Sequence, residues 1–188
     1  MRSTENPLPA PVLIGQRMLR QAADAPGLDP LAEATTAAVA PLTRSRPISA
    51  GLRGGWLGHA LHPLLTDFTN GPWMAASFLD LLGPPGSSPA ARRLVGLGLL
   101  AAAPTLLSGF VEWQGTDGAA RRVGVVHAAT SSLATILYGA SYVARRRGNQ
   151  RRGVVFAALG GVVAFLDGYV GGELSLVAKV GTGRRTSV

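Results

Sequence analysis

Four apolar stretches constrain the fold of this chain more than any other feature of its sequence. They run over Leu61–Gly83, Leu94–Trp113, Val123–Ala144 and Gly153–Val177. A helix needs about twenty apolar residues to cross a bilayer, so we predict four membrane-spanning helices. The connections between the stretches are short, which makes neighbouring helices antiparallel. The predicted fold is therefore all-α, an integral membrane up-down four-helix bundle.

The rest of the chain adds two parts to this bundle. Residues 1–57 are polar and rich in Pro and Gly, and we interpret them as an N-terminal extension. Within it, residues 28–41 have the pattern of a short amphipathic helix, with Asp29 as N-cap and Pro30 in the first turn. The alternative is that this segment is largely disordered. The four-helix domain is predicted over 58–183, and residues 184–188 form a tail.

Composition narrows the classes of function. The chain carries a formal net charge of +8, mostly from Arg, and it has no cysteine. Because the Arg residues sit at the ends of the apolar stretches, where they anchor helices, we expect a lipid bilayer as partner and no nucleic acid. The lack of cysteine excludes disulfides, thiolate catalysis and cysteine-ligated iron–sulfur clusters. We assign no catalytic residues and do not expect an enzyme.

A polar stripe follows one face of the first apolar stretch. At helical spacing the residues on this face are His62, Thr66, Thr69, Asn70, Trp73, Ser77 and Asp80. Polar groups are costly in hydrocarbon, so the stripe is predicted to face the other helices. Asp80, at the far end of the stripe, is expected to pair with Arg92 or Arg93 in the following loop.

Up-down folding would bring most ionisable residues of the spans to one end of the bundle. That end collects His59, His62, Asp67, Glu112, His127, Asp167 and Glu173. Charged groups inside a membrane usually mark function. The first and third spans run in the same direction, so we predict that His62 and His127 approach one another.

Several chemistries fit this cluster. Two histidines on separate helices can ligate haem iron, which makes His62 and His127 candidate cofactor-binding residues. Histidine with carboxylates can bind a transition metal, and the candidate ligands are His59, His62, Asp67, His127, Asp167 and Glu173. Histidine and aspartate can also relay protons. The alternative is that these groups only hydrogen-bond to one another and fix the helix packing. Haem b and a transition metal are thus the candidate cofactors.

The segment Trp56–Phe68, WLGHALHPLLTDF, resembles the opening of the bacterial membrane-protein family called domain of unknown function 2231. Later segments that resemble it are Gly109 with Trp113, Arg122–Ala128 and Gly168–Leu174. The resemblance covers about residues 28–183. It implies a four-helix membrane domain. Relatives often carry a Rieske domain, and some are joined to cytochrome domains. The resemblance therefore implies a redox setting with a separate Rieske or cytochrome protein as partner.

The sequence also departs from the pattern of this family. Ala60 replaces the first Pro of the usual G-H-P-L-H-P opening, and Ala178 stands where many relatives have a histidine. The second change weakens any cofactor site that needs a further histidine. His59, His62 and His127 are retained.

These observations leave three functional hypotheses open. The leading one is a redox-associated accessory or cofactor-binding module, multi-pass in the bacterial inner (plasma) membrane. The alternatives are a structural or assembly subunit without a cofactor, and a small transporter or proton-conducting protein. The densest Arg cluster lies in the loop 145–152, which favours a cytoplasmic location for that loop and an outside location for both termini.

Overall fold

The computed structural model describes residues 10–180, and within this range every regular element is helical. The predicted all-α class is therefore confirmed for the described part of the chain. The predicted tail at 184–188 lies outside the described residues. The elements, in order, are α1 (Ala10–Ala23), η1 (Pro26–Leu28), α2 (Asp29–Arg44), α3 (Arg46–Leu52), α4 (His62–Leu82), α5 (Ser88–Trp113), α6 (Gly118–Arg146), α7 (Gln150–Gly172) and the π-helical turn η2 (Glu173–Val177).

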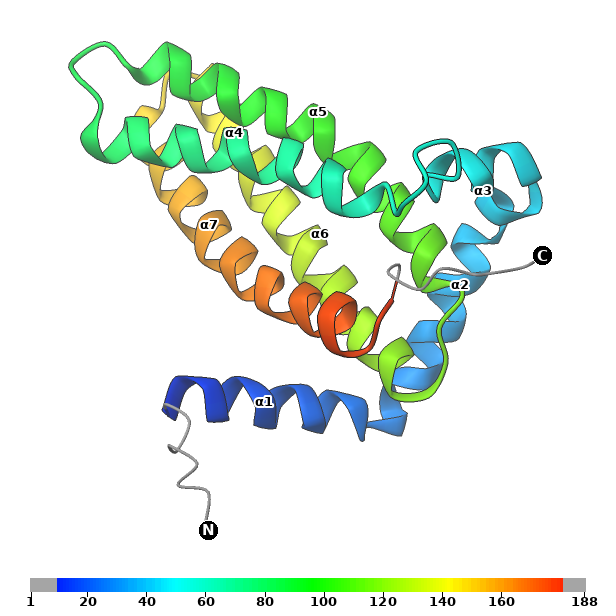
Figure 1. Ribbon diagram of the computed structural model, residues 1–188. Helices are drawn as coiled ribbons and strands as arrows, with labels where there is room; N and C mark the ends of the chain where they lie inside the picture. Colours follow the sequence, from blue (N-terminus) through cyan, green and yellow to red (C-terminus); the bar gives the residue numbers. More distant parts are fainter. Residues whose placement is uncertain (1–9, 181–188) are drawn as a thin grey trace, which may run out of the picture.

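The four long helices form two antiparallel pairs, α4 with α5 and α6 with α7 (Figure 1). The pairs lie close together at the end that holds the α4–α5 and α6–α7 loops. They separate toward the opposite end, where α2 and α3 lie (Figure 1). Helix α4 also contacts α7, and α5 contacts α6. The molecule therefore has a narrow end and a wide end.

Side chains pack tightly between the two pairs in the narrow half. The rings of Trp73 on α4 and Tyr138 on α6 are stacked, with centroids 4.0 Å apart and planes inclined by 12°. Both residues are almost fully buried, and Val95, Ala102 and Ala157 complete this core. Stacked aromatic rings bury a large apolar surface, so this pair contributes strongly to the packing between the helices.

A buried ion pair closes the narrow end. The guanidinium of Arg145 on α6 donates to both carboxylate oxygens of Asp80 on α4, at 2.9 and 2.5 Å. The side chains of Asp80 and Arg145 are 4% and 0% exposed. The prediction that Asp80 pairs with Arg92 or Arg93 was wrong. The partner comes from α6, across the core, rather than from the first turns of α5, where Arg92 and Arg93 lie.

The polar stripe of α4 faces the protein interior, as predicted. Thr69 and Trp73 are buried, and none of the other five stripe residues is exposed. The hydroxyl groups of Thr69 and Thr105 are 2.8 Å apart, which ties α4 to α5 halfway along the stripe. By contrast Phe68, Met74 and Phe78, on the outer face of α4, are about 60% exposed.

Three helical segments are long and apolar enough to cross a membrane, namely α5, α6 and Gln150–Leu176. Their outer faces expose large apolar side chains such as Leu100, Ile136 and Phe165, which suits contact with lipid. Helix α4 has 21 residues, but it is not among these segments. Its inward polar stripe lowers its mean hydropathy. The membrane-spanning four-helix bundle therefore stays a prediction for α4.

The N-terminal part consists of helices that dock on the wide end. The helix expected over 28–41 corresponds to α2, which begins at Asp29 and continues to Arg44. Asp29 is not the N-cap that the sequence suggested, because its carboxylate instead accepts two hydrogen bonds from Arg122 on α6, at 2.7 and 2.8 Å. Leu19 of α1 is buried against Val123. The sequence analysis did not anticipate α1 or α3.

Candidate functional site

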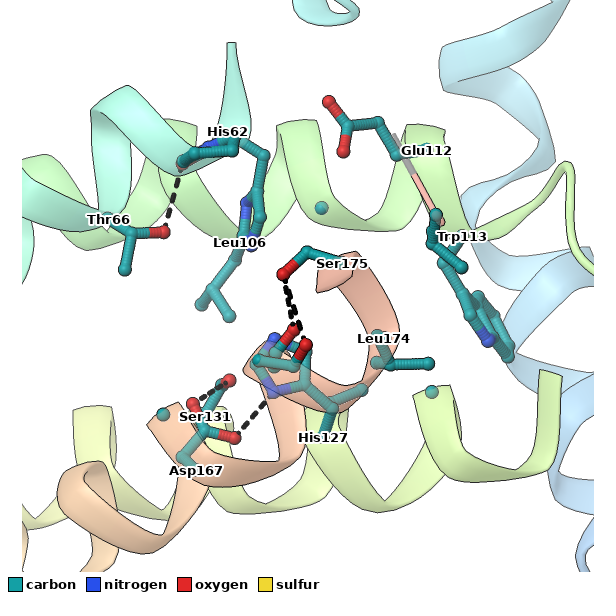
Figure 2. Close-up of a pocket in the computed structure, with 18 of the residues that line it drawn as sticks. His62, Thr66, Leu106, Glu112, Trp113, His127, Ser131, Asp167, Leu174 and Ser175 are labelled. Carbon is teal, nitrogen blue, oxygen red and sulfur yellow. Dashed lines mark hydrogen bonds and ion pairs between the residues drawn. The ribbon is translucent and has the colours of Figure 1, made fainter. Parts of the chain in front are cut away.

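A cavity of about 310 Å³ lies at the wide end, between the diverging helix pairs. Its walls come from α4, α5, α6, α7 and η2 (Figure 2). The ionisable side chains that line it are His62, Asp67, Glu112, His127 and Asp167. The larger apolar side chains are Leu106, Phe110, Trp113, Leu174 and Val180. A cavity with mostly apolar walls and a few convergent polar groups is typical of a small-molecule site.

The imidazole of His62 is held in place by α5. His62 is the first residue of α4, and Pro63 follows it in the first turn, where its missing N–H costs no hydrogen bond. The Nδ1 atom of His62 lies 2.9 Å from the carbonyl oxygen of Thr105 and 3.3 Å from the hydroxyl of Ser108. A carbonyl oxygen can only accept, so Nδ1 carries the proton and donates it.

The imidazole of His127 on α6 is held by Asp167 on α7. Its Nδ1 atom lies 2.8 Å from Oδ1 of Asp167, at ion-pair distance but away from the straight line of a hydrogen bond. Thr130 donates to the same carboxylate oxygen, and Ser131 donates to the other at 2.6 Å. Asp167 thus accepts from several groups at once, as an ionised carboxylate does.

The two imidazoles approach one another across the cavity, as predicted from the chain connectivity. Their ring centroids are 6.2 Å apart and their planes are perpendicular. Glycines on the neighbouring helices make room for the rings: a Cβ at Gly109 would lie 2.8 Å from Cε1 of His62, and a Cβ at Gly171 would lie 3.0 Å from Cε1 of His127. Both rings face the space between the helix pairs (Figure 2).

Two of the other candidate ligands join them at the cavity and two do not. Asp167 lies beside His127, and Asp67 lines the cavity although its side chain is exposed. His59 is exposed and its Nδ1 lies 2.9 Å from the carbonyl oxygen of Ala60, outside the cavity. Glu173, at the start of η2, does not line the cavity. Helix α4 begins only at His62, so His59 does not share a helical face with it.

The expected metal-ligand set is therefore not assembled. Among residues 10–180 no three His, Asp or Glu side chains come together as a metal ion would require. A structural or catalytic metal normally takes at least three protein ligands. The fold brings His62 and His127 together, and a metal centre formed by the six residues stays a prediction.

Some residues of the site were missed as partners by the sequence analysis. Thr105 acts on His62 through its backbone carbonyl, which no residue letter reveals. Ser131 was not predicted as a site residue, although it lies four residues after His127 on one helical face, and this spacing is a usable signal. Glu112 lines the cavity, and its Oε1 atom is buried without a hydrogen-bond partner in the described structure. Its carboxyl group points toward α4 (Figure 2).

These features define a helical, membrane-embedded protein with a mostly apolar cavity, which holds a few ionisable groups, between two pairs of helices. The chain belongs to the family DUF2231, described as predicted membrane protein, whose model matches residues 58–184. The resemblance seen in the sequence is therefore confirmed from residue 58 onward, and the model does not match the segment 28–57 that the resemblance was expected to include. The matched region begins just before α4, so it contains the whole cavity and leaves out α1–α3. No curated protein and no solved structure matches the chain.

Proposed function

We propose that this protein is a multi-pass module of the bacterial inner membrane that binds a small ligand between its two helix pairs. In this proposal α4–α7 form a membrane-spanning four-helix domain, and α4 is the helix whose polar face lines the binding site. Residues 1–57 are a separate extension in this proposal, and its described part, residues 10–57, packs on the wide end. The observation that carries the proposal is the pair of imidazoles at the cavity. His62 donates through Nδ1 to the Thr105 carbonyl, and Nδ1 of His127 lies at ion-pair distance from Asp167, so neither Nε2 is used by a described residue.

Histidine side chains in binding sites are commonly oriented in this way, through the ring nitrogen that does not contact the ligand. A ligating or hydrogen-bonding imidazole is usually oriented by a carbonyl or carboxylate at its other nitrogen. His62 has the Thr105 carbonyl and His127 has Asp167 in this role. A histidine that served only helix packing would be expected to use both ring nitrogens within the protein.

The size of the cavity favours a compact ligand over haem b. About 310 Å³ lies at the lower end of the range for small-molecule sites. A transition metal would need a further ligand beside the two histidines, and the described residues do not supply one there.

The proposal includes a redox-associated role, with a separate Rieske or cytochrome protein as partner. Co-purification from a native membrane tests that partner independently of the cavity.

Proton conduction is the weaker alternative. A conducting path would have to connect the wide end to the ion pair at the narrow end, and the stacked rings of Trp73 and Tyr138 lie between them. A purely structural role explains Asp80 and Arg145 well, because they satisfy one another. It does not explain why Oε1 of Glu112 is buried at the cavity without a hydrogen-bond partner among the described residues.

The experiment that tests the proposal compares the purified protein in nanodiscs with a His62→Ala, His127→Ala double variant. Bound metal is measured by elemental analysis, chromophores by the visible spectrum, and extractable small molecules by mass spectrometry. We expect the wild-type protein to carry or take up a ligand at up to one per chain, and the variant to lose it. Identical contents, with the same helicity by circular dichroism, would instead favour the structural role.

A further inference from the structure

The charge of the cavity restricts what it can hold. Its lining includes the carboxyl groups of Asp67, Glu112 and Asp167, and no Lys or Arg is among the lining residues of the described chain. Carboxylate groups repel anions and attract cations, most strongly where the surroundings have a low dielectric constant. An anionic ligand such as a phosphate or a carboxylate therefore does not fit.

The hydrogen-bonding groups of the cavity also favour a cation, because they are acceptors. In His62 the proton sits on Nδ1, because Nδ1 donates to a carbonyl oxygen. In His127 a proton on Nδ1 is favoured because a lone pair there would face a carboxylate oxygen 2.8 Å away, although the two atoms are not aligned for a hydrogen bond. In the neutral imidazole the other nitrogen is then an acceptor. Neither Nε2 atom forms a hydrogen bond with a described residue.

A third acceptor completes this pattern. Oε1 of Glu112 is buried and has no hydrogen-bond partner within residues 10–180. A buried acceptor without a donor is costly, typically by about 1–3 kcal/mol, so a ligand that supplies the donor gains affinity. The cavity thus offers acceptors from three different helices, and a matching ligand brings several donors and a positive charge.

The distance between the two imidazole rings limits the size of the group that binds to both. With centroids 6.2 Å apart and planes perpendicular, the imidazoles are close enough for one small group to contact both and too close for another ring to lie between them. A primary ammonium group has three N–H donors on one atom, as the lysine side chain does. A hydroxyl supplies only one donor, and a quaternary ammonium supplies charge without donors.

We propose that the cavity binds a primary ammonium cation that carries a small apolar substituent, a proposal that rests on the proposed ligand-binding function. The ammonium group lies between His62 and His127, and its substituent lies along the apolar wall formed by Leu106, Phe110 and Leu174. No bond is made or broken; the site recognises charge, donors and an apolar chain together.

The three histidines of the chain provide the test. Protein labelled with ¹⁵N-histidine is placed in phosphatidylcholine nanodiscs at pH 8, where a free imidazole is neutral and a primary alkylamine is protonated. The ring ¹⁵N shifts are followed during titration with butylammonium. We expect the Nε2 signals of His62 and His127 to move and those of the exposed His59 to stay fixed.

Two matched probes separate the contributions. Tetramethylammonium keeps the charge and loses the donors, and 1-butanol keeps the chain and one donor but loses the charge. We expect both to bind at least about tenfold more weakly than butylammonium, because charge-assisted hydrogen bonds are lost. Equal binding of either probe would overturn the ammonium assignment, and so would a titration in which butylammonium moves neither Nε2 signal.

A pair of variants at exposed residues gives a second test of the proposal without changing the buried core. Asp67 is exposed, so Asp67→Asn should fold normally, and it should weaken butylammonium binding several-fold by removing a carboxylate from the cavity. Glu33→Gln makes the same charge change on α2, outside the cavity, and should leave binding unchanged. Equal affinities in the two variants would contradict the proposal.

The same titrations distinguish this proposal from the one on which it rests. If Zn²⁺ or 1-butanol moves the Nε2 signals while butylammonium does not, the cavity binds ligands but the ammonium assignment is wrong. If none of the probes moves them, and the purified protein carries no ligand that the double histidine variant loses, both proposals fail.

Discussion

The orientation of His62 and His127 depends on single residues of the facing helices. Each ring lies against a glycine, so the position of the imidazole is set by the absence of a side chain as much as by its hydrogen bonds. Gly109 faces His62, and Gly171 faces His127. A methyl group at either position would compete with the ring for the same space.

At this scale we predict that Gly109→Ala weakens ligand binding without unfolding the protein. The added Cβ would lie 2.8 Å from Cε1 of His62, so the ring must move away from the Thr105 carbonyl. We expect a loss of affinity of about tenfold, the equivalent of one hydrogen bond, measured by calorimetry with butylammonium or with the native ligand once it is identified.

The matched control is Gly168→Ala. Gly168 also lines the cavity, but a Cβ there meets no atom within 4 Å. Its affinity should equal that of the wild-type protein. If both variants bind equally well, the close contact at Gly109 does not position His62.

From the sequence we could predict that His62 and His127 lie close together, but not which groups orient their rings. Connectivity places His62 and His127 at the same end, since their helices run in parallel directions. The partner of His62 is a backbone carbonyl, and backbone groups leave no mark in the sequence. The role expected for His59 failed for a local reason: the helix begins at His62, so residues before it do not continue its face.

The ion pair between Asp80 and Arg145 joins two elements that are far apart in the sequence. Because both side chains are buried, removing one partner leaves an uncompensated charge inside the protein. We predict that Asp80→Leu destabilises the fold by about 3–5 kcal/mol. Unfolding of the detergent-solubilised protein, followed by circular dichroism, measures this change.

The double variant Asp80→Leu, Arg145→Leu is the control for this prediction. It removes both charges, so it should recover most of the lost stability. Asn70→Leu, on the same face of α4, should cost much less because Asn70 is uncharged and lines the cavity. A double variant as unstable as Asp80→Leu would show that packing, not charge, dominates at this end.

The contact between α2 and α6 is predicted to depend on pH. The hydrogen bond from Arg122 lowers the pKa of Asp29 below its ordinary value of 3.8. A lowered pKa in the folded state stabilises the protein above the unfolded pKa, and this stabilisation is lost as the pH falls through the folded pKa. The thermal midpoint of Asp29→Asn should therefore lie below that of the wild-type protein at pH 7.

The two midpoints should begin to converge as the pH falls below about 4, and they should coincide once Asp29 is protonated in both states. Glu33→Gln, on the same helix, serves as the control and should show no such convergence. A constant difference between Asp29→Asn and wild type down to pH 2 would contradict the assignment.

The positions of the long helices in the sequence could be predicted, but the contacts between side chains of different helices could not. Stretches of apolar residues determine where α5, α6 and α7 lie, because length and composition suffice for that. The partner of Asp80 depends on how α4 crosses α6, which is a property of three-dimensional packing. Helix α1 was missed because its apolar residues cover only one face of a short segment, and it is stabilised by docking against Val123 and Leu174.

The orientation of the whole molecule in the membrane is open to direct test. We predict that the cavity end faces the outside and the α6–α7 loop faces the cytoplasm. The chain has no cysteine, so single variants can be labelled without background. In intact spheroplasts, an impermeant thiol reagent should modify Asp117→Cys, and it should modify Gln150→Cys only after the membrane is opened. The reverse pattern would place the cavity on the cytoplasmic side.

The unequal ends of the two helix pairs have a mechanical consequence for the surrounding bilayer. A protein that is narrow in one leaflet and wide in the other displaces more lipid area on its wide side, and α1–α3 add to that side (Figure 1). Such a wedge is accommodated best where the lipid packing of the two leaflets is already unequal. We therefore expect the protein to enrich in curved regions whose outer, stretched leaflet holds the wide end, so that shape alone would bias where in the cell envelope it gathers.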